Sequence, residues 1–156
     1  MIERIVSGGQ TGADRAALEF AIRHRITHCG WCPAGRMAED GTISSRYQLR
    51  ETPERSYSQR TEWNVRDSDG TVIFSIRKEL VGGSQLTQHF AQLHDKPFLH
   101  LSRENDTFTA AEKLREFIKE NRINILNVAG PRSSTEPEVE DFTNAVLLAA
   151  LITPTS

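Results

Sequence analysis

The chain has 156 residues, of which 37% are hydrophobic, and its 19 Lys and Arg against 21 Asp and Glu give a net charge of −2. This length is typical of one domain with a single core. The near-neutral charge argues against a nucleic-acid-binding protein. The longest apolar run, residues 145–152, has eight residues, whereas a membrane-spanning helix needs about 20. Since Met1 is followed by no signal-peptide pattern, we expect a cytoplasmic protein that binds neither nucleic acid nor membrane.

Short β-type runs alternate with amphipathic stretches of helical periodicity along the whole chain. The patterns predict a strand at 2–7, a helix at 13–23, strands at 26–31 and 70–76, a helix at 84–94, a strand at 97–101, a helix beginning with a Thr109–Glu112 capping box, a strand at 124–128 and a helix starting near Pro137. Such alternation implies right-handed crossovers. The predicted fold is therefore α/β: a Rossmann-like three-layer sandwich, with a mostly parallel sheet of about five or more strands and helices on both faces.

One segment, residues 32–69, is too long for an ordinary connection between two strands. It holds six arginines and seven acids, together with the apolar residues Tyr47, Leu49, Tyr57 and Trp63. Because these residues can anchor it, we expect the segment to be folded over the carboxyl edge of the sheet, with a short helix around residues 58–65. The whole chain, residues 1–156, is then one Rossmann-like domain.

Three glycine-bearing turns follow predicted strands. Turn 1 is residues 7–12 (Ser-Gly-Gly-Gln-Thr-Gly), turn 2 is residues 82–84 (Gly-Gly-Ser) and turn 3 is residues 129–134 (Ala-Gly-Pro-Arg-Ser-Ser). Glycine lets backbone N–H groups approach a ligand closely, and the N-terminus of the next helix adds a partial positive charge. In open α/β sheets such turns form the ligand crevice. Together they predict a site for an anionic or phosphorylated ligand.

Two common phosphate-binding motifs are missing. The chain has no Gly-x-x-x-x-Gly-Lys-Ser/Thr, and turn 1 reads Gly-Gly-x-x-Gly rather than Gly-x-Gly-x-x-Gly. The sequence therefore argues against P-loop hydrolysis and conventional NAD binding. Among the side chains near the turns, Arg132 offers a planar fork that suits an oxyanion. Asp14 and Ser84 could bind a ligand, or could simply begin a helix.

Cys29 and Cys32 form a Cys-x-x-Cys pair that ends a predicted strand and runs into Pro33. A thioredoxin-like site places the first cysteine at a helix N-terminus, and a zinc site needs a second pair of ligands. The five histidines show no ligand spacing either. The sequence therefore predicts no metal site made by the protein.

Residues 7–18, Ser-Gly-Gly-Gln-Thr-Gly-Ala-Asp-Arg-Ala-Ala-Leu, closely resemble the opening of the molybdenum carrier (molybdenum cofactor carrier-like) family, which belongs to the Rossmann-like SLOG superfamily. Further pieces agree in order along nearly the whole chain: residues 30–33, 36, 39–41, 47–52, 60–65, 67–71, 82–87, 96–97 and 127–132. The resemblance implies a small protein that binds molybdenum cofactor, or a related phosphorylated ligand, at its glycine turns without catalysis. It also implies a homo-oligomer, a dimer or a tetramer.

The expected ligand contacts combine the three turns with nearby polar side chains. They are Gly8, Gly9, Gln10, Thr11, Gly12, Asp14, Arg36, Gly82, Gly83, Ser84, Thr87, Gly130, Pro131, Arg132 and Ser134. The turns would bind the phosphate of the cofactor, and Arg or Thr side chains would bind the molybdate oxygens. Trp31 or Tyr47 could stack on the pterin, or could equally be a packing anchor. We predict no catalytic residue for this reading.

The SLOG superfamily also contains nucleotide phosphoribohydrolases, which makes a nucleotide such as AMP the alternative ligand. Those enzymes use Pro-Gly-Gly-x-Gly-Thr-x-x-Glu, where an acidic side chain assists cleavage of the glycosidic bond. Here the comparable residues 81–90 keep the glycine pair and a Thr, but Gln88, His89 and Phe90 stand in place of the acid. The departure favours binding over hydrolysis. A nucleotide sensor, or an enzyme that uses Asp14 or another acid instead, remains the alternative.

Overall fold

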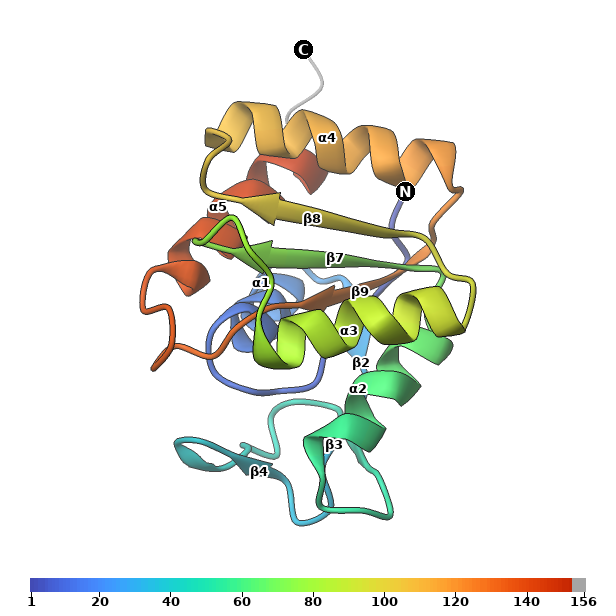
Figure 1. Cartoon of the computed structure of the whole chain (residues 1–156), viewed down its shortest axis with the longest axis vertical. Helices are drawn as coiled ribbons and strands as arrows, with labels where there is room; N and C mark the ends of the chain where they lie inside the picture. Colours follow the sequence, from blue (N-terminus) through green and yellow to red (C-terminus); the bar gives the residue numbers. More distant parts are fainter. Residues whose placement is uncertain (153–156) are drawn as a thin grey trace.

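The computed structural model describes residues 1–152 and has a five-stranded parallel sheet at its centre (Figure 1). The sheet order is β2-β1-β9-β7-β8, and every neighbouring pair runs parallel. The strands are β1 (Arg4–Val6), β2 (Thr27–Cys29), β7 (Gly70–Ser75), β8 (Phe98–Ser102) and β9 (Ile125–Ala129). The predicted Rossmann-like α/β fold is therefore confirmed.

Helices cover both faces of the sheet. On one face lie α1 (Ala13–Arg23), α4 (Thr107–Glu120) and α5 (Val139–Leu151), and on the other α2 (Tyr57–Arg66) packs against α3 (Gly82–Leu93). The large core lies under the first group and includes the fully buried Phe20, Phe74 and Leu114. A smaller core under α2 and α3 contains Val65 and Phe90. Each helix packs its apolar face inward, and this packing positions the two outer layers.

The strand order is a circular permutation of the usual Rossmann order, which begins 3-2-1-4-5. If β9 and α5 are moved from the end of the chain to its start, β9, β1, β2, β7 and β8 become strands one to five. The observed sheet then reads 3-2-1-4-5. The order reverses between β9 and β7, and ligands of open α/β sheets bind outside the carboxyl ends of the strands at such a point.

Three element boundaries differ from the predictions. The predicted strand 26–31 is divided at Gly30 (φ 148°), where a Cβ atom would lie 2.0 Å from the carbonyl oxygen of Ser7. The cap of α4 is Asp106 rather than Thr109, since its carboxylate accepts the N–H of Thr109 at 2.7 Å; Asp is a stronger N-cap than Thr. The last helix begins at Val139, beyond Pro137.

The segment 32–69 is folded and lies against turn 1. It contains the hairpin of β4 (Met37–Ala38) and β5 (Gly41–Thr42), then β6 (Arg50–Glu51), which pairs with β3 (Trp31–Cys32), and finally α2. Cys32, Ile43 and Tyr47 form a core with Leu18 of α1. The helix expected around residues 58–65 is present as α2. Within residues 1–152, no helix is long and apolar enough to cross a membrane.

Candidate functional site

The three glycine turns lie together at the carboxyl ends of β1, β7 and β9. A Cβ atom on Gly12 of turn 1 would be 2.3 Å from the carbonyl oxygen of Pro131 in turn 3. One on Gly130 would be 2.4 Å from the carbonyl oxygen of Phe74 and 2.6 Å from Cβ of Ala13. No side chain fits such approaches, so both positions require glycine.

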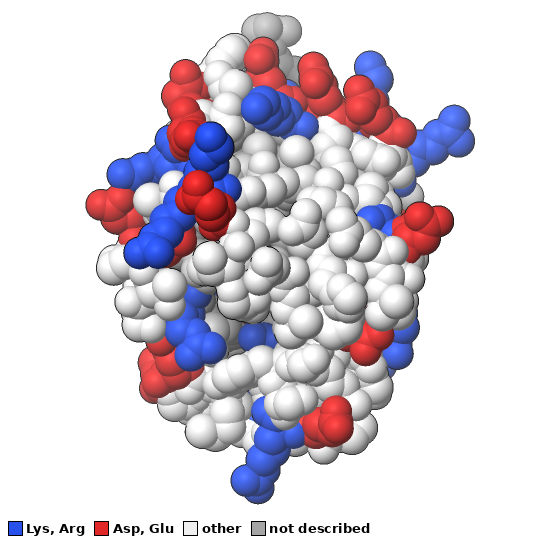
Figure 2. All heavy atoms as spheres, in the orientation of Figure 1, with Lys and Arg blue, Asp and Glu red and all other residues white. Residues whose placement is uncertain are grey.

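A cavity of about 440 Å³ lies between these turns and α2, at the point where the strand order reverses. Its volume is within the range of small-molecule sites. Ten of the fifteen predicted contacts line it: Gly8, Gln10, Asp14, Gly82, Gly83, Ser84, Thr87, Gly130, Pro131 and Arg132. The face in Figure 2 has a hollow beside the start of α3, with basic atoms at its edge.

Helix α2 forms a wall of the cavity that sequence reasoning missed. It contributes Tyr57, Arg60, Thr61 and Asn64, while Asn127 and Thr135 also line the cavity. The pairs Arg60-Thr61 and Asn64-Val65 belong to the family resemblance described above, and this resemblance was the available signal that α2 takes part in the site. Nothing local in the sequence indicates that this helix turns back onto turn 1, where Arg60 binds the carbonyl of Gly8.

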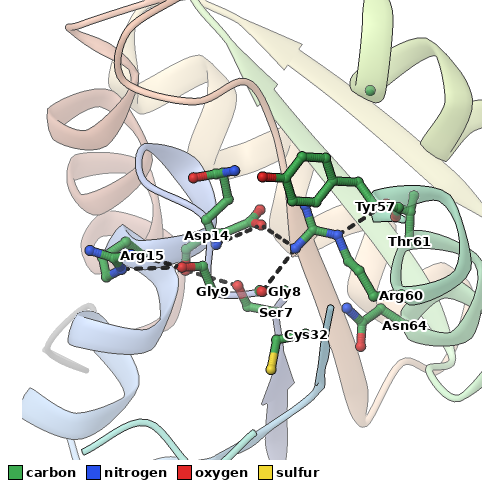
Figure 3. A network of polar contacts seen from close by, with 12 residues as sticks. Ser7, Gly8, Gly9, Asp14, Arg15, Cys32, Tyr57, Arg60, Thr61 and Asn64 are labelled. Carbon is green, nitrogen blue, oxygen red and sulfur yellow. Dashed lines mark hydrogen bonds and ion pairs between the residues drawn. The ribbon is translucent and has the colours of Figure 1, made fainter. Parts of the chain in front are cut away.

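Arg60 and Asp14 form a buried ion pair in the cavity wall (Figure 3). Nη1 of Arg60 lies 3.8 Å from Oδ2 of Asp14 and donates to the carbonyl oxygen of Gly8 at 2.8 Å. The side chains are 10% and 9% exposed. Oδ2 also accepts the N–H of Gln10 at 3.3 Å. Burial raises the pKa of Asp14 from 3.8 to about 6, although the nearby arginines act in the opposite direction.

Two guanidinium groups lie over the ring of Tyr57. The distances from the ring centre are 5.2 Å for Arg60 and 5.4 Å for Arg132. With the residues that the structure describes, the side chain of Arg132 makes no hydrogen bond or ion pair. Since guanidinium presents five N–H donors in a fixed plane, Arg132 can bind an oxyanion without breaking a side-chain hydrogen bond within the protein.

Two further donors in the cavity lack partners. Nε2 of Gln10 and Oγ of Ser84 are buried, and neither has a hydrogen-bond partner among residues 1–152. The amide oxygen of Gln10 is used, because it accepts the N–H groups of Thr11 and Glu39. Buried polar groups are normally satisfied, and acceptor atoms of a ligand in the cavity can satisfy both donors.

Of the predicted contacts outside the cavity, Thr11 and Ser134 meet Glu39 of the inserted segment. Its carboxylate accepts the hydroxyl groups of both residues and the N–H of Ser134 at 3.2 Å. These bonds lower the pKa of Glu39. The protein's own carboxylate thus occupies the donors that the sequence suggested for a ligand.

The remaining three predicted contacts hold the backbone together. Gly12 packs on turn 3, and the carbonyl of Gly9 accepts two N–H groups of Arg15, at 3.0 and 3.2 Å. Arg36 lies outside the cavity, within the inserted segment. Its guanidinium donates to the carbonyl oxygens of four residues: Ile43, Ser44, Tyr47 and Leu49.

The aromatic residues suggested for stacking lie elsewhere too. The indole of Trp31 donates to Asp67 at 2.8 Å, and the hydroxyl of Tyr47 contacts Glu19. Neither residue lines the cavity. Cys29 and Cys32 are free thiols whose pKa values burial raises. No group of three or more His, Cys, Asp or Glu within the described part of the chain is placed to hold a metal ion.

Comparisons with known proteins agree with the permuted fold. Residues 5–151 match the model of the circularly permutated YpsA SLOG family. The chain is similar to a "putative molybdenum carrier protein" from Syntrophus aciditrophicus SB, with 48% identity and a TM-score of 0.94 over 96% of this chain and 95% of that one. No curated protein matches the chain. These findings confirm the resemblance noted in the sequence, and the chain belongs to the circularly permutated YpsA SLOG family.

Proposed function

We propose that the protein is a carrier that binds molybdenum cofactor, or a related phosphorylated small molecule, in the cavity between the three glycine turns and α2. The observation that carries the proposal is the convergence of unused donors on one cavity. Gln10 Nε2 and Ser84 Oγ are buried without hydrogen-bond partners in the described part of the chain, and the guanidinium of Arg132 is open to a ligand. The name of the similar Syntrophus protein supports the carrier role.

The start of α3 is suited to the phosphate group. Gly82 and Gly83 are exposed, and a Cβ atom at either position would meet nothing within 4 Å. Their backbone therefore faces open space at the positive end of a helix of 12 residues, where anions are stabilised. Ser84 supplies a hydroxyl in the same turn. Arg132, on the opposite side, could form a bidentate contact with a phosphoryl group or with molybdate oxygens.

A nucleotide hydrolase is the second candidate function, because of one observation. Asp14 is the only acid among the residues that line the cavity, and its pKa of about 6 suits proton transfer near neutral pH. It would take the role of the acid whose place is held in α3 by Gln88, His89 and Phe90, none of which lines the cavity. AMP is the simplest substrate with which to test this alternative.

The deciding experiment is an anaerobic titration with molybdenum cofactor, with AMP in a parallel cell. Binding is followed by the fluorescence of Trp31 and Trp63, whose rings lie 4.8 Å apart beside the wall formed by α2. Saturable binding of the cofactor but not of AMP supports the carrier. Binding of AMP with release of adenine supports the hydrolase, and binding of neither ligand contradicts both.

We also propose that the protein is a homo-oligomer, a dimer or a tetramer. This proposal rests on the self-association that is common among SLOG proteins. Light scattering at micromolar concentration measures the mass directly, and a mass of 17.6 kDa would contradict it.

A further inference from the structure

We infer that Asp14 makes the cavity select oxyanions that can bring a proton, such as phosphate and phosphoryl groups, over those that cannot, such as sulfate and free molybdate. This inference rests on the proposed function, since it requires an anion to bind beside Asp14. It predicts that the cargo is held through a phosphoryl group, and that molybdate enters only as part of a larger phosphorylated molecule.

The wall of the cavity carries charged side chains of both signs. Among the lining residues, Arg60 and Arg132 are basic and Asp14 alone is acidic. The charged groups that act on the Asp14 carboxyl are Arg60 from α2, Arg15 from its own helix and Arg132 from turn 3. Arg15 is already engaged by the carbonyl of Gly9 and by Asp40, at 2.9 Å. Arg132 lies over the same Tyr57 ring as Arg60, so an anion bound by Arg132 lies beside the ion pair of Arg60 and Asp14.

An oxyanion beside the Asp14 carboxylate needs a proton between the two groups. An ionised carboxylate only accepts hydrogen bonds, and so does an oxyanion without a proton. Two such groups in contact repel each other unless one proton lies between them. Hydrogen phosphate carries this proton at neutral pH. A phosphate monoester, with a second pKa of about 6, supplies it at small cost, whereas sulfate and molybdate have none to supply near neutral pH.

Under acidic conditions the carboxyl group of Asp14 itself can supply this proton. Asp14 is buried with its charge only partly compensated by Arg60 at 3.8 Å, and burial raises its pKa to about 6. Below this pH Asp14 donates to any oxyanion, so the selectivity disappears. Above it, sulfate must bind together with a proton from solvent, and its affinity falls about tenfold for each pH unit.

The test compares hydrogen phosphate with sulfate, two tetrahedral anions of similar size. Each is titrated into the full chain by calorimetry between about pH 5 and about pH 8.5, at constant ionic strength and in two buffers with different enthalpies of ionisation. We expect the affinity for sulfate to fall steeply above pH 6, with uptake of one proton per anion bound, while the affinity for phosphate changes little. Free molybdate, titrated at about pH 8, should behave as sulfate does.

Two variants test whether Asp14 causes the pH dependence of sulfate binding. Asp14→Asn removes the charge, and it should bind sulfate at about pH 8 as tightly as at pH 5.5. Asp40→Asn removes an acid that pairs with Arg15 outside the cavity, and it should keep the wild-type profile. Thermal unfolding of each variant reports whether it is folded. If Asp14→Asn does not fold, the wild-type protein still tests the inference, since sulfate binding without uptake of a proton above pH 6 would contradict it.

The outcomes separate the two proposals. If the wild-type protein binds neither phosphate nor sulfate at any pH, the anion site is wrong and the proposed function fails with it. If both anions bind equally well at about pH 8, or if Asp14→Asn retains the pH dependence, the anion site stands and the selectivity by Asp14 is overturned.

Discussion

The carboxyl group of Asp14, on the first turn of α1, lies 3.8 Å from the guanidinium of Arg60, on the helix of the inserted segment. The contact links turn 1 to the wall formed by α2, because the same guanidinium also binds the carbonyl of Gly8. The pair is buried at the edge of a cavity, so changes to either residue should affect both stability and binding.

Asp14→Asn should remove the pH dependence that Asp14 gives to the stability of the empty protein. Because the pKa of Asp14 rises from 3.8 to about 6 on folding, the folded state binds the proton more tightly than the unfolded state. Stability contributed by the neutral form is therefore lost as the pH rises from about 4 to about 6. Relative to the wild type, the free energy of unfolding of Asp14→Asn should be about 3 kcal/mol higher at pH 7.5 than below pH 4, on top of a pH-independent cost of leaving Arg60 without its charged partner. Urea unfolding measures it, and an equal difference at both pH values contradicts the prediction.

Arg60→Met should destabilise the protein strongly. It leaves the carboxylate of Asp14 and the carbonyl of Gly8 without their buried partner, and breaking such a pair costs about 3–5 kcal/mol. Arg66→Met is the matched control on the same helix, since Arg66 pairs with Asp67 at the surface and should cost at most about 1 kcal/mol. Similar midpoints in urea unfolding for the two variants would disagree with this prediction.

Arg132→Ala should weaken binding while leaving stability almost unchanged. With residues 1–152 the guanidinium forms no hydrogen bond, and it only lies over Tyr57. Loss of its contact to an oxyanion should reduce the affinity for phosphate about tenfold or more, equivalent to about 1.4 kcal/mol. Calorimetric titration and thermal unfolding measure the two effects. An unchanged affinity would remove Arg132 from the site.

Gly12→Ala should separate turn 1 from turn 3. Gly12 has φ +85°, and a Cβ atom there would be 2.3 Å from the carbonyl of Pro131. Gly41→Ala is the control, because Gly41 has φ +116° but nothing within 4 Å. Both variants carry backbone strain of about 1–3 kcal/mol, but Gly12→Ala should also weaken phosphate binding. Equal affinities in the two variants would show that the turn contact does not shape the site.

Glu39→Ala should loosen turn 3 without unfolding the chain. The Glu39 carboxylate accepts the N–H and hydroxyl of Ser134 and the hydroxyl of Thr11. Hydrogen exchange should become faster at Ser134 and in the β4–β5 hairpin, and stay unchanged in α4. In the wild-type protein these bonds lower the pKa of Glu39, so their contribution is present above pH 4.5 and is lost as the pH falls through the lowered value. Exchange that Glu39→Ala leaves unchanged would count against this role.

The sequence predicted many of the residues that line the cavity, because these residues follow local patterns. Strands rich in β-branched residues followed by glycine turns predict ligand contacts at one edge of a parallel sheet, and Gly83, Ser84 and Arg132 do line the cavity there. Thr11 and Ser134 have the same residue chemistry, but Glu39 occupies their hydroxyl groups. No local pattern shows such an internal partner, because it comes from a hairpin distant in the sequence.

The sequence by itself determined the alternation of strands and helices, the glycine turns and the family, because each depends on neighbouring residues or on motifs read in order. The tertiary structure decided the permuted strand order and the position of α2 beside the cavity. Both depend on which apolar faces meet, such as Val65 of α2 with Phe90 of α3, and on contacts between distant segments. The burial that joins Asp14 to Arg60, and raises the pKa of Asp14, exists only when these segments have packed.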